Sequence, residues 1–149
     1  KDLLSAAISP EGTMNALWTL QGLDALSDTL LEKAFQDASP LVRKQAVLLS
    51  ESRLGNKPIF DKVISASSDS DPFVQFQVAL TLSNVAKSNQ EIFPALNRII
   101  STHINDKWFQ TAVLLGASEN AIQWYEASKD FEVKVDSQKV DKREFLRKI

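Results

Sequence analysis

Hydrophobic positions recur along the chain at intervals of three and four residues, which is the period of an amphipathic helix. Three segments each place four such residues on one helical face: Leu30, Leu31, Ala34 and Phe35; Ile59, Phe60, Val63 and Ile64; Phe93, Leu96, Ile99 and Ile100. A second set of segments, near residues 42–49, 74–82 and 109–114, alternates with the first and has the same period. The pattern predicts helices joined by short turns over almost the whole chain.

Short polar stretches separate the predicted helices, and four of them combine an N-cap residue with a residue suited to the first helical position. They are Ser9-Pro10, Ser39-Pro40, Asp71-Pro72 and Asp106-Lys107. Ser and Asp side chains accept hydrogen bonds from the first free N–H groups of a helix, and proline has no N–H to leave unpaired there. Helices are therefore expected to begin at Pro10, Pro40, Pro72 and Lys107.

The four segments that begin at these residues resemble one another, at spacings of 30, 32 and 35 residues. We number this repeat frame from its first residue, so that Pro10, Pro40, Pro72 and Lys107 are position 0. Position +2 is then Gly12, Val42, Val74 and Phe109, and position +6 is Ala16, Ala46, Val78 and Val113. Small or apolar residues at these positions allow stacked helices to approach closely. The sequence predicts an all-α fold, an α-α superhelix of about three to four helix pairs.

The segment from Asp37 to Ala46 carries the pattern Asp-x-x-Pro-x-Val-Arg-x-x-Ala and resembles the second-helix signature of HEAT repeats, which are armadillo-like. Asp71-Pro72-x-Val74 resembles another copy, and the resemblance covers about residues 10–127. In that family a ladder of Asp and Arg side chains ties neighbouring repeats. Only Arg43 fits the Arg position here, because Gln75 and Gln110 replace it, so the ladder is expected to be reduced to neutral hydrogen bonds.

A narrower likeness is carried by Ala16–Leu23, followed by Asp37–Arg43. These segments are similar to the HEAT segment of large secreted bacterial proteins, in which a sugar-dehydrogenase-like β-propeller and a cytochrome c domain flank the repeats. The resemblance implies a periplasmic or secreted location and a multidomain parent that could be dehydrogenase-like. Neither flanking domain is in this chain, so no redox activity is assigned to it.

The ends of the chain suggest an excerpt of a larger protein, with a repeat domain at 1–129 and a tail, or the start of a further helix, at 130–149. In the tail, 131–135 alternates apolar and charged residues, which fits an extended edge or a linker. Asp141 and Glu144 are spaced as in a capping box that opens a helix.

Composition gives little support for catalysis. Cysteine is absent and His103 is the single histidine, so thiolate metal sites and thiol nucleophiles are excluded and no histidine-based ligand spacing exists. Asp69-Ser70-Asp71 lacks the glycine and the glutamate of a calcium loop and is expected to be a turn. We predict no catalytic, cofactor-binding or metal-binding residues.

Charge and hydropathy exclude two further classes of partner. The net charge of −2 offers no basic surplus for nucleic acid, whose binding depends on counterion release from phosphates. No apolar run approaches the length that spans a membrane. The expected partners are therefore proteins or neighbouring domains of the same chain.

The aromatic residues are expected to pack inside the stack. Trp18 aligns with leucines at position +8 and is assigned to the core, whereas Trp108 aligns with Phe73 and is assigned to a wedge between repeats. Trp124 and Tyr125 are expected to cover the end of the stack.

In a HEAT-like stack the second helices line the concave side, and positions +3 to +5 are predicted to be exposed there. The candidate partner surface is Arg43, Lys44, Gln75, Phe76, Gln77, Gln110 and Thr111. Because this surface is largely uncharged, the sequence favours a non-catalytic scaffold or protein-interaction module. The alternative is a HEAT-like DNA-binding enzyme of the alkylpurine DNA glycosylase type, whose groove would need more basic residues than Arg43 and Lys44.

Overall fold

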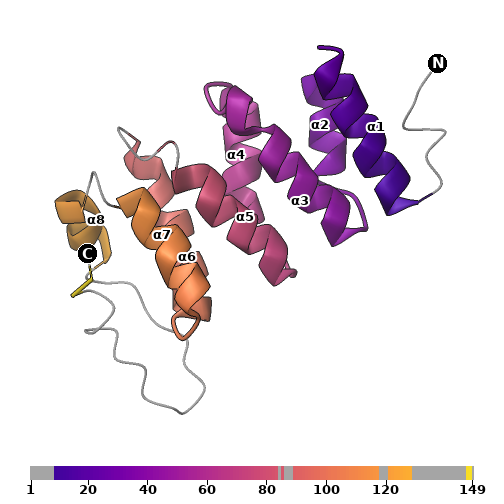
Figure 1. Cartoon of the computed structure of the whole chain (residues 1–149). Coiled ribbons are helices and arrows are strands. Elements are labelled where there is room, and N and C mark those ends of the chain that lie inside the picture. The colour runs from indigo at the N-terminus through magenta and orange to yellow at the C-terminus, as the bar shows by residue number, and fades with distance from the viewer. Residues whose placement is uncertain (1–8, 84, 86–88, 118–120, 129–146, 149) are drawn as a thin grey trace. The chain divides into compact units, whose positions relative to one another are not determined.

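The computed structural model describes residues 9–83, 85, 89–117, 121–128, 147 and 148 (Figure 1). Within these residues every regular element is helical, which confirms the all-α prediction. The α helices are α1 (Pro10–Gly22), α2 (Asp28–Ala34), α3 (Pro40–Leu49), α4 (Lys57–Ala66), α5 (Pro72–Ser83), α6 (Phe93–His103), α7 (Lys107–Ala117) and α8 (Ala121–Ser128). Short 3-10 turns at Glu51–Arg53 and Gln90–Ile92 complete the set.

Helices α1, α3, α5 and α7 begin at the four residues that the sequence predicted, and side-chain caps fix three of these starts. The Ser9 hydroxyl accepts from the Gly12 N–H at 3.1 Å. Asp71 Oδ1 accepts from the Phe73 N–H at 2.9 Å, and Asp106 Oδ1 accepts from the Trp108 N–H at 2.8 Å. Each cap satisfies a donor that the helix itself leaves without an acceptor, which is why the start falls at that residue.

The chain divides into two compact units, residues 1–77 and residues 78–149, with the boundary inside α5. In the N-terminal unit α3 packs against α1 and α2, and α2 also contacts α4. Figure 1 shows α1 and α3 side by side, with α2 behind them. Their apolar faces close over a core that includes Leu17, Leu31, Val42, Ala46 and Ile59.

In the C-terminal unit α6 packs against both α7 and α8. Leu96, Ile99 and Ile100 of α6 are fully buried, as is Val113 of α7. Trp124 of α8 is also fully buried, and its indole N–H donates to Asn97 Oδ1 at 2.8 Å. The packing predicted for Trp124 is confirmed, whereas its neighbour Tyr125 is exposed.

Two aromatic assignments made from the sequence are wrong. Trp18 is 44% exposed and Trp108 is 76% exposed, so neither is a core or wedge residue. The features predicted for 131–135 and 141–149 lie outside the described residues, apart from residues 147 and 148, which form a turn.

Candidate functional site

Helices α1, α3, α5 and α7 are the second helices of the predicted pairs. In α3, α5 and α7 the residue at position +3 fastens the turn that precedes the helix. The side chains of Arg43, Gln75 and Gln110 each donate to the backbone carbonyl six residues earlier. The acceptors are the carbonyls of Asp37 at 2.9 Å, Asp69 at 2.5 Å and Ile104 at 2.6 Å. These three residues, predicted to face a partner, are therefore committed to holding the turn and the helix together.

Arg43, the residue at the arginine position of the HEAT-like pattern, also forms an ion pair with Asp69. Its Nε lies 2.7 Å from Asp69 Oδ2 and its Nη2 lies 2.8 Å from Asp69 Oδ1. This bidentate hydrogen bond lowers the pKa of Asp69 below its ordinary value, although partial burial opposes the shift. The same bond raises the pKa of Arg43. The Arg43 charge is thus neutralised inside the N-terminal unit.

The other predicted surface residues have different environments. Gln77 is buried, only 8% exposed, so the expectation that position +5 is exposed is wrong there. Lys44 and Phe76 are half-buried, and Thr111 is exposed with its hydroxyl donating to the Lys107 carbonyl at 2.8 Å. Gln110 Oε1 accepts from Lys148 Nζ at 2.9 Å.

The exposed side of each second helix is formed by positions +1, +4 and +8. At 100° per residue these three positions fall within one arc about 60° wide. We call these residues the outer ridge: Glu11, Met14 and Trp18 on α1; Leu41, Lys44 and Leu48 on α3; Phe73, Phe76 and Leu80 on α5; Trp108, Thr111 and Leu115 on α7. All twelve are exposed or half-buried, and nine are hydrophobic.

Trp18 is held in a defined orientation although it is exposed. Its indole N–H on α1 donates to Gln45 Oε1 on α3 at 2.9 Å. The bond joins neighbouring second helices and fixes an aromatic ring on the surface, which lowers the entropy lost if a ligand contacts that ring.

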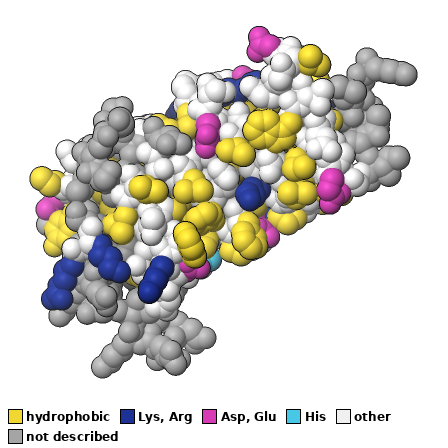
Figure 2. Space-filling model, in the orientation of Figure 1, with side chains coloured by type: hydrophobic (Ala, Val, Ile, Leu, Met, Phe, Trp, Pro, Cys, Tyr) yellow, Lys and Arg dark blue, Asp and Glu magenta, His cyan; other side chains and the backbone are white. Residues whose placement is uncertain are grey.

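A hollow of about 220 Å³ lies between the first turns of α3 and α5, within the N-terminal unit. Its lining is largely apolar and consists of Pro40, Leu41, Lys44, Asp71 and Phe73. Phe73 is 69% exposed, so its ring forms an open wall. Figure 2 shows hydrophobic side chains, in yellow, exposed on the face that α1 and α3 present.

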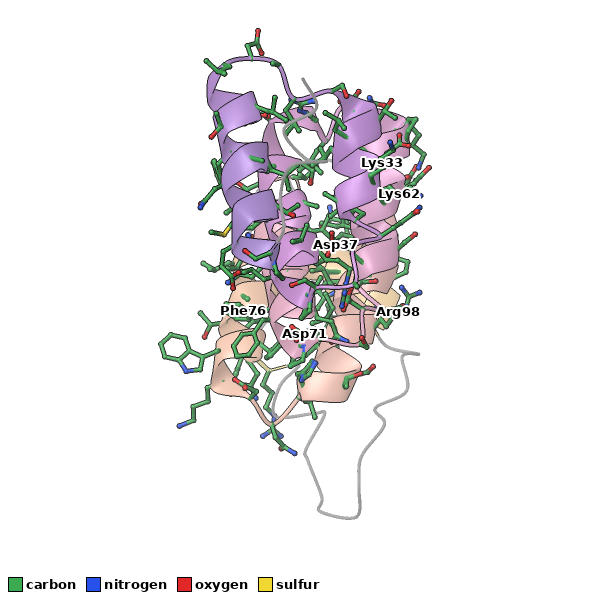
Figure 3. The ribbon with its side chains drawn as sticks, turned by 90° about the vertical axis from the view of Figure 1, so that its right-hand side faces the viewer. Lys33, Asp37, Lys62, Asp71, Phe76 and Arg98 are labelled. Atoms are coloured by element: carbon green, nitrogen blue, oxygen red, sulfur yellow. The ribbon has the colours of Figure 1, made fainter. Side chains whose placement is uncertain are left out.

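A second hollow of about 260 Å³ lies in the same unit and is more polar; its lining includes Gln36, Lys62, Ser65 and Asp69. Figure 3 shows Lys62 of α4 and Lys33 of α2 on one side of this unit, and Phe76 of α5 on the other side. The Asp69 carboxylate in this hollow is already engaged by Arg43. Because this carboxylate is engaged and the lining is more polar, the hollow beside Phe73 is the better candidate for an apolar ligand.

The single histidine, His103, packs against an aromatic ring. His103 stacks on Phe109 with ring centroids 3.9 Å apart, and burial lowers its pKa although Asp106 opposes the shift. Burial thus disfavours the cationic ring, although His103 lies in the last turn of α6, where the helix dipole favours a positive charge. Across the described residues no cluster of His, Asp and Glu side chains could hold a metal, and no helix there is long and apolar enough to cross a bilayer.

The chain matches no protein-family model, no curated protein and no solved structure. Sequence reasoning missed position +1, occupied by Leu41, Phe73 and Trp108. The available signal was a large apolar residue directly after the first helical residue in three of four repeats.

Proposed function

We propose that this chain is a non-catalytic helical-repeat module that binds other proteins, or neighbouring domains of its own chain, through the outer ridge of its second helices. One observation carries the proposal. Of the seven large hydrophobic side chains that are exposed among the described residues, four occupy position +1 or +8: Trp18, Phe73, Trp108 and Leu115. Exposed apolar side chains that share one face of a helix are suited to interaction surfaces, and aromatic residues are enriched at protein interfaces.

Helices α2, α4 and α6, the first helices of the predicted pairs, differ from the second helices in their exposed side chains. On α6 the exposed residues Pro94, Arg98 and Thr102 are spaced four apart, and none is a large hydrophobic. On α7 the corresponding exposed face carries Trp108 and Leu115. Because both helices belong to one unit and pack on each other, the difference supports a partner on the second-helix side.

Charge disfavours the alternative of a DNA-binding enzyme. The outer ridge carries one acidic and one basic side chain, Glu11 and Lys44. Arg43, the other basic residue predicted for a groove, is neutralised by Asp69. A surface without a basic surplus gains little from counterion release. The HEAT type of the repeats is a further part of the proposal and is supported by the motif at Asp37–Ala46. The setting in an exported bacterial protein is another part, and the likeness carried by Ala16–Leu23 and Asp37–Arg43 supports it.

Site-specific photo-crosslinking tests the proposed function with a matched pair of positions. Thr111 of α7 and Thr102 of α6 are both exposed, and the hydroxyl of each donates to the carbonyl four residues earlier. A benzophenone side chain at position 111 should form an adduct with a partner in cells that make the protein, whereas position 102 should not. Equal adducts from both positions, or none from 111, would contradict the proposal. Salt-sensitive binding to duplex DNA would favour the glycosylase-like alternative.

A further inference from the structure

The hollow between α3 and α5 has the size and the walls of a pocket for one apolar side chain. Pro40 and Leu41 line it from the first turn of α3, and Phe73 lines it from the first turn of α5. Its volume of about 220 Å³ accommodates a leucine, methionine or phenylalanine side chain. Such a side chain would remove the exposed Phe73 ring and the Leu41 side chain from water, which is the main source of affinity for an anchor residue.

The charge at the edge of this hollow comes from Lys44. Lys44 lies one turn after Leu41 on α3, so the two side chains share a face. In the described part of the chain Lys44 forms no ion pair, whereas its neighbour Arg43 is paired with Asp69. The Lys44 side chain is half-buried, and an ammonium group beside an apolar pocket attracts an acidic group of a ligand.

Asp71 also lines the hollow, but its carboxylate serves the start of α5. Asp71 Oδ1 accepts from the N–H groups of Phe73 at 2.9 Å and of Val74 at 3.2 Å. The positive end of the helix dipole offsets its charge at that point. Among the described residues no ion pair engages the Lys44 ammonium, so it is the positive charge at this hollow that remains for a ligand.

We propose that this hollow binds a short acidic segment of a partner protein: one large apolar side chain fills it, and a carboxylate beside that side chain pairs with Lys44. This inference rests on the proposed function and specifies the chemistry of the partner. Apolar contact supplies the anchor, and the Lys44 pair supplies selectivity against basic sequences, because charge pairs at an interface edge mainly discriminate between partners.

Selection from random peptides displayed on phage tests the inference on the whole chain. Peptides enriched by the wild-type protein should combine one large apolar residue with adjacent Asp or Glu, and Lys44→Glu should enrich Lys or Arg at those positions instead. A synthetic copy of an enriched peptide should bind Phe73→Ala about tenfold more weakly. The matched control is Leu23→Ala: Leu23 is 68% exposed but does not line the hollow, so its replacement should leave binding unchanged.

The outcomes separate this inference from the proposed function. Peptides without acidic residues, a peptide preference that Lys44→Glu does not change, or no enrichment at all would overturn the inference. Sedimentation that shows a dimer lost in Phe73→Ala would also overturn it, because a second copy would then occupy the hollow. Crosslinking at Thr111, in the other unit, can still succeed in each of these cases. If a circular dichroism spectrum shows that Phe73→Ala is misfolded, the charge reversal at Lys44 decides.

Discussion

The link between Arg43 and Asp69 allows the most direct test of the structure, because glutamine occupies the position of Arg43 in two other repeats. Arg43 binds Asp69 through two charge-assisted hydrogen bonds and also donates to the Asp37 carbonyl. Gln75 and Gln110 occupy the same repeat position and make the same bond to the turn, but a neutral amide cannot form the ionic link. Arg43→Gln should therefore remove the ionic link and keep the turn bond, whereas Arg43→Ala should remove both.

The expected cost follows from burial. The side chains of Arg43 and Asp69 are only 15% and 11% exposed, so water replaces the lost partner poorly. We expect Arg43→Gln to lower the free energy of unfolding by about 2–3 kcal/mol, and Arg43→Ala by about 1 kcal/mol more. Asp61→Asn is the control, because the Lys57–Asp61 pair on α4 is 62% and 58% exposed. Breaking it should cost less than about 0.5 kcal/mol.

Acid should weaken the same link. The hydrogen bond from Arg43 is the largest cause of the lowered pKa of Asp69, whose ordinary value is 3.8. A carboxyl whose pKa is lower in the folded protein contributes stability above the unfolded value, and that contribution is lost as the pH falls through the folded value. Urea unfolding followed by circular dichroism should show that wild type loses more stability than Arg43→Gln between neutral pH and about pH 3.

If Arg43→Gln lowered the free energy of unfolding no more than Asp61→Asn at neutral pH, the stabilising role of the Arg43–Asp69 link would be refuted. Equal losses on acidification in wild type and Arg43→Gln would refute the assignment of the Asp69 pKa to Arg43. A double-mutant cycle of Arg43→Gln with Asp69→Asn isolates the coupling, which should be the larger part of either single effect.

Three further predictions follow from the described side chains. Trp124→Phe should lower the free energy of unfolding by about 1–3 kcal/mol, because it removes the donor to buried Asn97; a thermal or urea melt with unchanged stability would contradict this. The single imidazole, His103, should titrate below 6.5 by NMR, with its signals shifted by the Phe109 ring; since the folded pKa is lowered, its contribution to stability is present above 6.5 and is lost as the pH falls below it. Iodide should quench the fluorescence of Trp108 strongly and that of Trp124 hardly at all. Trp108→Phe should therefore remove quenchable fluorescence and Trp124→Phe should not, and the opposite result would contradict the prediction.

The helix starts could be predicted from the sequence because they depend on local chemistry. An N-cap residue followed by proline favours a helix start at that proline through bonds within the first turn. Helices α1, α3 and α5 begin at the prolines that this pattern indicated. The three apolar faces of the first helices were predictable for a related reason, since periodicity alone places Ile59, Phe60 and Val63 on one side.

The partner surface was less predictable because three consecutive positions cannot share a helix face. Positions +3, +4 and +5 are 100° apart, so they point in three directions. In α5 these residues are Gln75, which bonds to the turn, half-buried Phe76 and buried Gln77. The bond of Gln75 depends on where the turn places the Asp69 carbonyl, and the sequence carries no signal for that geometry.

The error at Trp18 has a different cause. The prediction treats an apolar residue that recurs at one repeat position as buried, but apolar residues also recur at exposed positions, as Trp18 and Leu115 do at position +8. The two cases differ on α5, where apolar residues occur on both sides of the helix: Val74 and Val78 face inward, and Phe73 faces outward. Under the proposed function, the exposed apolar side of such a helix is the side that contacts a partner. Helices α2, α4 and α6 expose no large hydrophobic side chain among the described residues, and α6 carries Arg98 and Thr102 on its exposed side, so these helices serve as the support.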